Sequence, residues 1–574
     1  MKCLNQNETV AARYNAWLND PLIDEATKEE LRGLAGEEKE ITDRFYRDLE
    51  FGTGGLRGVM GAGTNRLNAY TVGKATQGLA NWLLQQQQGK SPAAVIAHDS
   101  RNLSPEFALD SALVLAANGV TTYLFQSLRP TPQLSFAVRT LGASAGVVIT
   151  ASHNPPEYNG YKAYGADGCQ LIPEDAEQVI ASIQQVSGFD EVKRMSREEA
   201  EQQGLLVWLG EEADEQYTDI VVAQSLNSEL LKSGLGDQFK VVFTPLHGTG
   251  NLPVRAVLNK AGFNNVHIVA EQEQPDGYFS TVKSPNPEER EAFTLAIKLA
   301  QDVGADIIIG TDPDADRMGA VVKNNEGEYV VLTGNQSGAL MVHYVLSQLK
   351  ERGQLPDNGV VIKTIVTSEM GADIARSFGA AVENTLTGFK YIGEKMTAYE
   401  QSGERSFLFG YEESYGYLTG TYARDKDAIV ASLLICEAAA YYSSQGKTLY
   451  DVLLELYKEH GVYLEGLESR TLKGLDGVQK IAGIMNDWRN TPPTDVNGVA
   501  VERVLDYLQG LDGLRAENVL KYMLADGSWF CLRPSGTEPK IKVYFAVRGQ
   551  STEQAGEALA QLRSAVMERV DSHA

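Results

Sequence analysis

Short apolar runs that each end in a polar loop recur along this chain, and they constrain its fold more than any other feature. In the first part, strands are predicted at 93–97, 120–125 and 145–150, with helices near 104–118 and 131–141 between them. Such alternation favours a parallel sheet covered by helices. Open sheets of this kind carry their chemistry at the carboxyl ends of the strands, so the loops behind these runs are the first candidates for a site.

The same pattern returns twice further along the chain. The strands predicted there lie at 241–244, 266–270, 305–309, 359–365, 380–383 and 406–409. The polar segment 185–215 is rich in Glu and Gln, contains few strand signals, and indicates a junction between the first and second series. Three successive units with one order of elements predict three similar α/β domains, related as diverged duplicates.

The two ends of the chain differ from this pattern. Residues 1–48 have apolar side chains at helical spacing, which predicts a helical N-terminal arm. From about residue 456 the pattern is α+β, with helices predicted near 474–490 and 498–510, strands at 529–532 and 540–547, and a closing helix after Ser551. We therefore predict an α/β protein with the arm at 1–48, domain I at 49–210, domain II at 211–331, domain III at 332–455 and a smaller domain IV at 456–574.

Charge and cysteine usage narrow the class of protein. The chain of 574 residues has 51 Lys and Arg against 76 Asp and Glu, a net charge of −25. This balance argues against nucleic-acid partners and anionic membranes, so an anionic ligand would need a local cluster of Lys and Arg. The four cysteines form no C-x-x-C pair, and we find neither a leader nor an apolar stretch of about 18 residues. We expect a cytoplasmic protein.

The loop Thr150–Pro156 places Ser152 at the carboxyl end of the apolar run 145–149. Small polar residues before an Asn-Pro-Pro turn often only satisfy backbone donors, and that is the plainer interpretation of this loop alone. An exposed loop on a rigid strand also suits a reactive hydroxyl. Other segments have to decide between the turn and the nucleophile.

Asp312, Asp314 and Asp316 follow the strand at 305–309 at every second position. Three such carboxylates repel one another without a cation, and hard oxygen ligands suit Mg²⁺ or Mn²⁺, often together with phosphate. An EF-hand would need Gly and Glu where this chain has Arg317 and Lys323. An acidic surface turn would explain one or two of the aspartates.

Two further loops offer groups that bind phosphates and sugars. Arg533–Lys540 combines a guanidinium, two hydroxyls, a glycine and an ammonium, which suit a phosphate dianion, although Pro-Ser-Gly is also an ordinary turn. No Walker-type P-loop occurs. Gly410–Gly416 carries two carboxylates and a hydroxyl that could accept from sugar hydroxyls, or could form a solvated loop. Together with Ser152 and the aspartates, these loops are the components of phosphoryl transfer.

With these four motifs in this order, the chain resembles the α-D-phosphohexomutase family, in its phosphoglucomutase and phosphomannomutase group. The motifs are Thr150–Pro155, Asp312–Arg317, Gly410–Gly416 and Arg533–Thr537, and they span nearly the whole chain. The resemblance implies a heart-shaped enzyme with three similar α/β domains with mixed sheets and a smaller α+β domain, whose loops meet in a central cleft. It also implies that Ser152 carries a phosphoryl group and passes it to a sugar phosphate through a bound hexose 1,6-bisphosphate.

The resemblance assigns roles to individual residues. The implied metal ligands for Mg²⁺, or Mn²⁺, are Ser152, Asp312, Asp314 and Asp316. The implied catalytic residues are Ser152, His153, Lys162 and Lys426; desolvation and cationic neighbours could lower a Lys pKa enough for acid–base work. The implied substrate-binding residues are Arg57, Arg317, Thr387, Glu412, Ser414, Arg533, Ser535, Gly536 and Thr537.

Two departures bear on the substrate. Tyr411 stands where the family usually has G-E-x-S without an insertion, and the N-terminal arm lies outside the common core. Both resemble the subgroup of bacterial α-phosphoglucomutases and of animal enzymes active on pentose phosphates. The Glu-Glu-Ser sequence of this loop favours glucose over mannose as the sugar.

The leading hypothesis is a phosphoglucomutase activated by glucose 1,6-bisphosphate, working as a monomer or weak dimer. The alternatives are phosphomannomutase or phosphopentomutase activity, a metal-dependent phosphatase, and a sugar-phosphate binding protein without activity.

Overall fold

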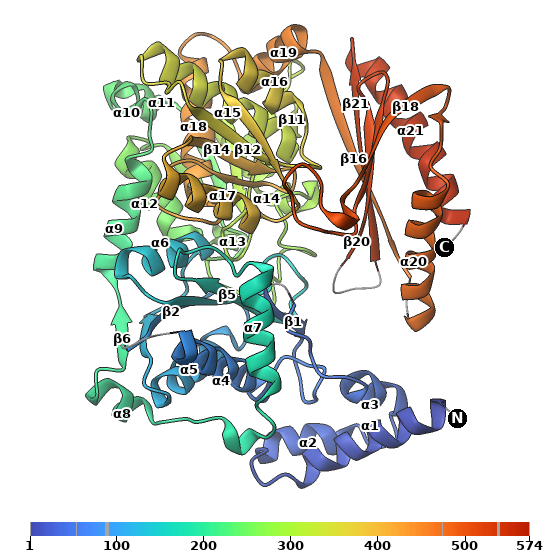
Figure 1. The fold of residues 1–574 in the computed structure, drawn as a ribbon. Helices are drawn as coiled ribbons and strands as arrows, with labels where there is room; N and C mark the ends of the chain where they lie inside the picture. Colours follow the sequence, from blue (N-terminus) through green and yellow to red (C-terminus); the bar gives the residue numbers. More distant parts are fainter. Residues whose placement is uncertain (1, 53, 87–90, 473, 536–539, 573–574) are drawn as a thin grey trace.

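The computed structural model describes residues 2–52, 54–86, 91–472, 474–535 and 540–572 (Figure 1). Four sheets follow one another along the chain, three of them layered with helices and the last antiparallel. This arrangement confirms the predicted class of three α/β domains with mixed sheets and a smaller α+β domain. Within the described ranges, the helices include none with the length and apolar character needed to span a bilayer.

Three helices precede the first sheet: α1 (Lys2–Asn19), α2 (Glu25–Gly33) and α3 (Glu38–Phe45). Their apolar side chains gather around Trp17, whose ring lies edge-on to Phe45 at 5.8 Å and to Phe189 at 5.5 Å. Phe189 lies in sequence between two strands of the first sheet, so these aromatic contacts fasten the helices to that part of the molecule.

The first sheet has the strand order β1-β5-β4-β2-β3-β6. Its strands are β1 (Gly55–Val59), β2 (Ala93–His98), β3 (Thr121–Phe125), β4 (Ala145–Ile149), β5 (Tyr158–Gly165) and β6 (Leu206–Leu209). β2, β3, β4 and β6 are parallel, whereas β5 is antiparallel to β1 and β4. The accompanying helices are α4 (Ala69–Gln86), α5 (Ser104–Ala117), α6 (Thr131–Leu141), α7 (Pro173–Gln184) and α8 (Arg197–Gln202). Every residue of β4 is buried, which explains its uninterrupted apolar run.

The second sheet has the order β11-β10-β9-β7-β8. Its strands are β7 (Val241–Thr244), β8 (Val266–Ile268), β9 (Ile307–Thr311), β10 (Met318–Lys323) and β11 (Tyr329–Val331). The helices of this part are α9 (Glu211–Val222), α10 (Ser228–Leu230), α11 (Gly236–Gln238), α12 (Asn251–Ala261), α13 (Ala270–Glu273) and α14 (Thr294–Val303). β9 and β10 pair antiparallel, so the three aspartates lie in the turn of a hairpin.

The third sheet has the order β13-β12-β14-β15. Its strands are β12 (Gly359–Thr364), β13 (Ala381–Thr385), β14 (Ser406–Glu412) and β15 (Gly416–Leu418). The helices are α15 (Gly334–Glu351), α16 (Met370–Ser377), α17 (Phe389–Ser402), α18 (Ala428–Ser443) and α19 (Leu449–His460). The turn from β14 to β15 carries the predicted sugar loop.

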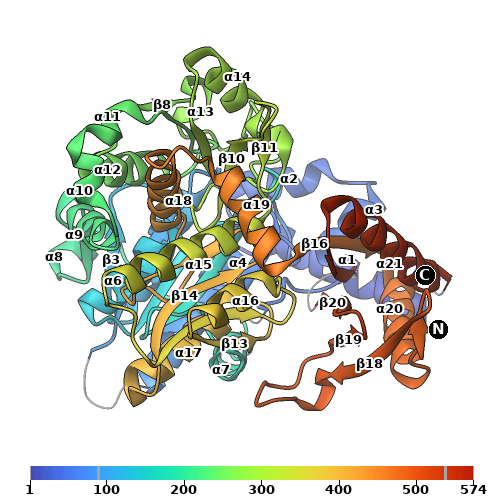
Figure 2. The same cartoon turned by 90° about the horizontal axis from the view of Figure 1, so that it is seen from above.

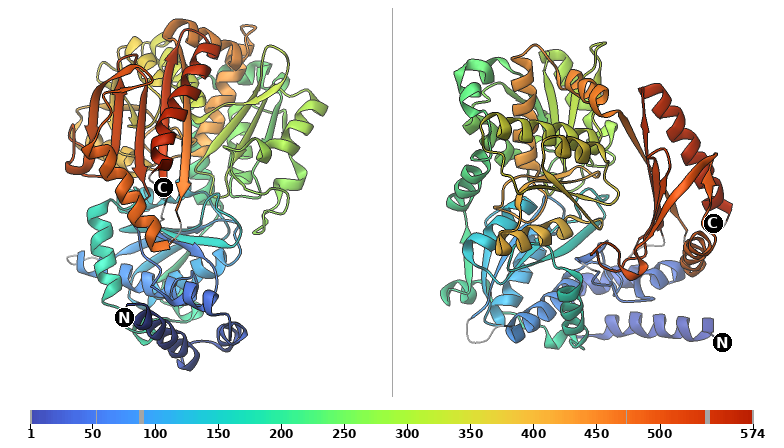
Figure 3. Two further views of the ribbon diagram at one scale, coloured as in Figure 1. Left: turned by 90° about the vertical axis from the view of Figure 1, so that its right-hand side faces the viewer. Right: turned by 45° about the horizontal axis from the view of Figure 1, so that its top comes forward.

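The fourth sheet is antiparallel throughout, in the order β16-β21-β20-β19-β18-β17. Its strands are β16 (Val462–Thr471), β17 (Asp495–Val496), β18 (Val499–Asp506), β19 (Leu520–Leu524), β20 (Trp529–Pro534) and β21 (Lys540–Gly549). The helices α20 (Gly474–Asn490) and α21 (Thr552–Ser572) accompany it, and Figures 2 and 3 show this unit standing beside the other three. Buried apolar residues of domains II, III and IV form one continuous cluster, whereas domain I has cores of its own.

One prediction about secondary structure is wrong, and the edge strand β6 of the first sheet was not predicted. The segment 498–510 is not a helix, because Asn497 and Gly498 both have positive φ, 52° and 79°, and form a tight turn that pairs β17 with β18. The segment 185–215 contains β6, an edge strand beside β3, while its place as a domain junction stays a prediction. β6 is four residues long, and so short a run gives little periodic signal.

Candidate active site

Three loops from different parts of the chain meet at Ser152. Ser152 follows β4, the three aspartates form the turn between β9 and β10, and Lys426 lies just before α18. The Ser152 hydroxyl donates to Asp312 Oδ2 at 2.6 Å, across 160 positions of sequence. The structure therefore brings the predicted nucleophile and the predicted metal loop into direct contact.

Ser152 is buried, with 4% of its surface exposed, because the aspartate hairpin lies over it. The expectation of an exposed loop is wrong for this side chain. Its backbone has φ 52°, in the left-handed region that non-glycine residues seldom adopt. His153 Nδ1 lies 3.1 Å from Ser152 Oγ. Burial and the charges of Arg317 and Arg57 lower the pKa of His153 well below its usual value, so the ring is neutral.

Asp312, Asp314 and Asp316 form a buried cluster whose candidate ligand oxygens all lie within 4.8 Å of one another. Burial and the charges of Asp314 and Asp316 raise the pKa of Asp312. Oδ1 of Asp314 and Oδ1 of Asp316 are buried and bond to no other described residue. Buried carboxylate oxygens without partners are costly, and a divalent cation would satisfy them. The cluster can therefore hold a metal ion.

Lys162 and Lys426 line the same carboxylates. Lys162 Nζ donates to Asp314 Oδ2 at 2.7 Å and to Asp316 Oδ2 at 3.0 Å, and Lys426 Nζ lies 2.9 Å from Asp316 Oδ2. Burial alone would lower both lysine pKa values, but the aspartates reverse the effect and raise them. The expectation of a lowered Lys pKa is therefore wrong, and both side chains are ammonium groups in this state.

The predicted sugar loop begins inside β14. The Glu412 side chain is buried and accepts a hydrogen bond from the Gly388 amide at 2.9 Å, next to Thr387. Burial raises the pKa of Glu412 to about 7. Thr387 Oγ1 is buried and has no hydrogen-bond partner among the described residues, while Ser414 is half-buried in the turn to β15. A buried carboxylate beside a hydroxyl without a partner among the described residues suits a polyhydroxylated ligand.

Two arginines join the loops. Arg57 is exposed on β1, and its Nη1 donates to Asn154 Oδ1 at 3.2 Å in the Ser152 loop. The Arg317 amide donates to Asp312 Oδ1 at 3.0 Å, and its guanidinium pairs with Glu288, a partner that sequence reasoning missed.

The predicted phosphate loop is described in part. Arg533 Nε donates to Glu517 Oε1 at 3.0 Å, and the Ser535 amide donates to the Lys540 carbonyl at 2.7 Å. Gly536 and Thr537 lie outside the described residues.

Other cations gather near this loop. Burial lowers the pKa of Lys542, and the charges of Lys540 and Arg317 lower it further. Burial also lowers the pKa of Lys390, and the charge of Arg533 adds to this decrease. Neighbouring cations repel one another, and a bound anion relieves that repulsion. These lysines and arginines therefore form the local positive cluster that a phosphate ligand needs in a chain with a net negative charge.

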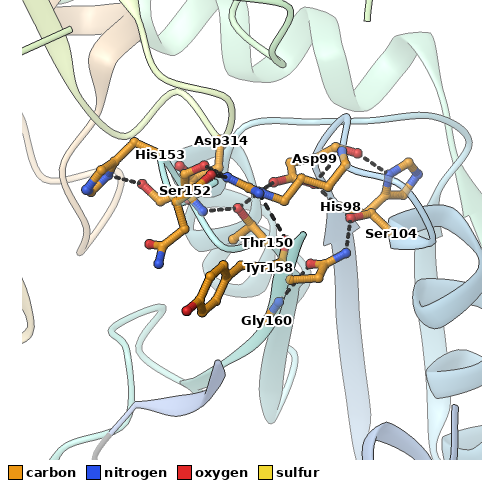
Figure 4. A network of polar contacts seen from close by, with 12 residues as sticks. His98, Asp99, Ser104, Thr150, Ser152, His153, Tyr158, Gly160 and Asp314 are labelled. Atoms are coloured by element: carbon orange, nitrogen blue, oxygen red, sulfur yellow. Dashed lines mark hydrogen bonds and ion pairs between the residues drawn. The ribbon is translucent and has the colours of Figure 1, made fainter. Parts of the chain in front are cut away.

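Sequence reasoning also missed Asp99 and Arg101, which hold the Ser152 loop through Thr150 and through the Ser152 carbonyl. Figure 4 shows Asp99, Thr150 and Ser152 in one polar network. Asp99 and Arg101 both lie directly behind β2, so the rule that chemistry follows the carboxyl ends of strands could have found them. Asp99 Oδ2 accepts a hydrogen bond from Thr150 Oγ1 at 2.7 Å, and Thr150 Oγ1 accepts one from the Ser152 amide at 2.8 Å.

Comparisons with known proteins agree with this geometry. The family models match in four parts, described as phosphoglucomutase/phosphomannomutase alpha/beta/alpha domain I at 48–188, domain II at 215–327, domain III at 333–460 and C-terminal domain at 477–565. A phosphoglucomutase of Staphylococcus haemolyticus is 39% identical over 524 residues, covering 89% of this chain and 93% of that protein. One of Staphylococcus aureus is 38% identical over 523 residues, covering 89% and 91%.

Solved structures share the fold. The Paramecium pp63/parafusin phosphoglucomutase has a TM-score of 0.70 at 19% identity and covers 92% of this chain and 95% of its own. A phosphoglucomutase/phosphomannomutase family protein of Burkholderia thailandensis has a TM-score of 0.65 at 19% identity, covering 91% and 97%. Four ordered domain matches and near 40% identity over most of the chain confirm the resemblance drawn from the four motifs. The chain belongs to the phosphoglucomutase/phosphomannomutase family and is an enzyme of the phosphohexomutase class.

Proposed function

We propose that this enzyme is a phosphoglucomutase that interconverts α-D-glucose 1-phosphate and glucose 6-phosphate. The observation that carries the proposal is the 2.6 Å contact between Ser152 Oγ and Asp312 Oδ2, inside a cluster of three buried carboxylates and two ammonium groups. A hydroxyl in this setting can accept a phosphoryl group whose charge the surrounding cations neutralise. The relatives named phosphoglucomutase support glucose as the sugar.

In this proposal, Ser152 accepts and returns the phosphoryl group. The bond from phosphorus to Ser152 Oγ breaks as the bond to a sugar hydroxyl oxygen forms, which yields bound glucose 1,6-bisphosphate. Transfer of the other phosphate back to Ser152 then leaves the isomeric monophosphate. We assign Lys162 and Lys426, which the aspartates keep protonated, to general acid–base work at the reacting oxygens. One ammonium donates a proton to Ser152 Oγ as the phosphoryl group leaves, and the proton of the attacking sugar hydroxyl replaces it through this pair. His153, which is neutral, orients the Ser152 hydroxyl.

Other residues bind the sugar phosphate. Glu412 and Ser414 accept from the sugar hydroxyls. Arg533, Ser535, Gly536 and Thr537 are proposed to bind the phosphate that is not transferred. Arg57, Arg317 and Thr387 complete the contacts. Because the intermediate must turn around between its two transfers, the cation cluster near Arg533 has to accept either end of the sugar.

We propose Mg²⁺, with Mn²⁺ as a substitute, as the metal ion of Asp312, Asp314, Asp316 and the Ser152 side chain. When bound, the ion supplies positive charge that stabilises the transferring phosphoryl oxygens. Glucose 1,6-bisphosphate is the proposed activator, because it can phosphorylate Ser152 in enzyme that has lost its phosphoryl group.

The mutase proposal is tested by following the phosphorus. Purified enzyme with glucose 1-phosphate, Mg²⁺ and a trace of glucose 1,6-bisphosphate is expected to give glucose 6-phosphate in ³¹P NMR spectra. A phosphatase would release inorganic phosphate instead, and that result would contradict the proposal. In the same assay, mannose, ribose and deoxyribose 1-phosphates test the phosphomannomutase and phosphopentomutase alternatives. We expect glucose to have the highest kcat/KM.

The raised pKa of Glu412 predicts a pH dependence. Below about pH 7 the carboxyl group gains a proton and loses acceptor capacity, so kcat/KM should fall about tenfold per pH unit on the acid side. The folded state binds this proton more tightly than the unfolded state, so this group's contribution to the unfolding free energy decreases as the pH rises through the window up to about 7. In Glu412→Gln, the pH profile of kcat/KM should lose this fall and retain only the effect of the substrate phosphate, which titrates near pH 6. If the fall of kcat/KM below about pH 7 is unchanged in Glu412→Gln, another group causes it.

Three broader predictions remain. The domain division at residues 48, 210, 331 and 455 stays a prediction, as does a monomeric or weakly dimeric state, which sedimentation would measure. Cys169, Cys436 and Cys531 are buried free thiols, which supports the proposed reducing, cytoplasmic location.

A further inference from the structure

Arg101 is a buried arginine whose terminal nitrogens bond to backbone carbonyls. Its side chain is fully buried, and it lies in the turn between β2 and α5. Nη2 donates to the carbonyl of Ser152 at 2.5 Å and to that of Asn154. Nη1 donates to the carbonyl of Pro155 at 2.8 Å and to that of Tyr158 at 3.0 Å. One guanidinium thus binds four carbonyls of the loop that carries Ser152.

These four carbonyls define the conformation of the loop. Ser152 has φ 52°, a backbone state that persists only where the surroundings fix it. A planar guanidinium offers donors in a fixed fork, so the four acceptors have to adopt one mutual arrangement. A lysine ammonium has three donors on a flexible stem and cannot hold the same four carbonyls in place.

Asp99 holds both Arg101 and the start of the loop. Its Oδ1 accepts from the Arg101 amide at 2.9 Å and from Ser104 Oγ at 2.8 Å. Its Oδ2 lies 3.3 Å from Arg101 Nε and accepts from Thr150 Oγ1 at 2.7 Å. Because Thr150 in turn accepts from the Ser152 amide, Asp99 holds the Ser152 amide through Thr150 (Figure 4). Arg101 holds the Ser152 carbonyl directly.

An aromatic ring from domain II covers a face of the Arg101 guanidinium. The Phe279 ring lies 4.9 Å from Arg101 Cζ, and Phe279 is 1% exposed. A stacked aromatic ring keeps water from the guanidinium and from its carbonyl partners. Arg101 therefore fixes the Ser152 loop only where domain II, which also supplies Asp312, is packed against domain I.

We propose that Arg101 is a positioning residue that holds the Ser152 hydroxyl on the metal loop, with Asp99 and Phe279 as its supports. All four of its Nη donors are used inside the protein, so Arg101 has no terminal donor left for a substrate phosphate. The inference rests on the proposed role of Ser152 as the phosphoryl acceptor. Its expected consequence is a slower transfer step with little change in sugar-phosphate binding, which depends on other loops.

The test measures transfer and loop order separately. ³²P-labelled glucose 1,6-bisphosphate is mixed with excess enzyme, and the rate of label transfer to Ser152 is followed. A displacement of about 1 Å can cost about 100-fold in rate, so Arg101→Lys should transfer about 100-fold more slowly while the KM for glucose 1-phosphate stays within about threefold. In Arg101→Ala, added guanidinium at about 10 mM should restore the rate about tenfold by occupying the vacated fork site. Phe279→Leu should slow transfer by a smaller factor, about tenfold.

Arg569→Ala is the matched control. Arg569 also stacks on an aromatic ring, with Cζ 4.2 Å from the Trp488 ring, and donates to the carbonyls of Asp487 and Thr491, but it lies in domain IV on α21. We expect its transfer rate to be unchanged and unaffected by guanidinium.

Hydrogen exchange of the amides of 151–159 gives a readout that does not require activity. Faster exchange there in Arg101→Lys, with Arg569→Ala unchanged, supports the proposal. Wild-type exchange in this segment, or wild-type transfer by Arg101→Lys, would overturn the positioning role. Absence of label on Ser152 in wild-type enzyme would instead overturn the proposed function, while the exchange result would still decide the role of Arg101. The positioning role is also contradicted if Arg101→Ala transfers the label slowly and guanidinium does not restore the rate, while Arg101→Lys transfers it at the wild-type rate.

Discussion

Replacing Ser152 with alanine is expected to lower conversion of glucose 1-phosphate at least about 10⁴-fold, because the reaction loses the oxygen that carries the phosphoryl group between the two sugar positions. The Ser152 hydroxyl is buried against Asp312, and neighbouring carboxylates cannot substitute for it in that position. The change removes the hydrogen bonds of the hydroxyl to Asp312 Oδ2 and His153 Nδ1, which cost about 1 kcal/mol of unfolding free energy each, so the protein should remain folded. Coupled detection of glucose 6-phosphate, together with a thermal unfolding curve, measures both effects.

Ser182→Ala is the matched control for this experiment. Ser182 is also 4% exposed and in domain I, but its hydroxyl bonds to the Gln178 carbonyl within α7. Its activity should stay within about twofold of wild type, since the serine lies within α7 and belongs to none of the loops that meet at Ser152. A Ser152→Ala enzyme that retained more than a few per cent of the activity would remove Ser152 from the reaction.

Asp314→Asn is expected to weaken Mg²⁺ binding and to lower kcat about 10²- to 10³-fold, since a metal ion contributes several kcal/mol to transition-state stabilisation. The substitution is nearly isosteric. The amide oxygen can still accept from Lys162 and Thr131, which now donate to Oδ2 at 2.7 and 2.9 Å. The amide nitrogen then takes the place of Oδ1, which bonds to no other described residue, and a nitrogen that carries protons cannot ligate a cation.

Metal affinity and activity should therefore fall together in Asp314→Asn, while the melting temperature without metal changes little. Calorimetric titration with Mg²⁺ and Mn²⁺ measures the affinity, and the dependence of kcat on metal concentration measures the activity. Asp219→Asn, which alters an exposed partner of Lys260, should change neither. Wild-type Mg²⁺ affinity in Asp314→Asn would exclude this carboxylate as a ligand.

The parts of the fold that depend on buried parallel strands could be predicted from the sequence. The run at 145–149 is buried along its whole length, and such strands are apolar at every position, so β4 and the place of Ser152 behind it could be read directly. The loop spacing of Asp312, Asp314 and Asp316 likewise indicated a cation site, since carboxylates placed so closely require a counter-charge.

The predictions that failed concern features that depend on contacts between segments distant in the sequence. The burial of Ser152 follows from the hairpin at Asp312, which no local pattern near residue 152 reveals. The direction of the pKa shifts of Lys162 and Lys426 follows from their distances to Asp316, 3.0 and 2.9 Å, whereas burial alone predicts the opposite sign. The position of Arg101 behind β2 makes it a candidate, but its burial and its four carbonyl partners depend on the loop at 152–158, which is distant in the sequence. β18 was missed although its Asn497-Gly498 turn is a local hairpin signal.

The central claim is that Ser152 passes its phosphoryl group to a sugar rather than to water. Enzyme carrying ³²P on Ser152 can be mixed with unlabelled glucose 1-phosphate and quenched over the first turnover. We predict that the label leaves the protein only when the sugar phosphate is present and appears first in glucose 1,6-bisphosphate and then in glucose 6-phosphate. Release of the label as inorganic phosphate, at the same rate with and without the sugar phosphate, would contradict this account.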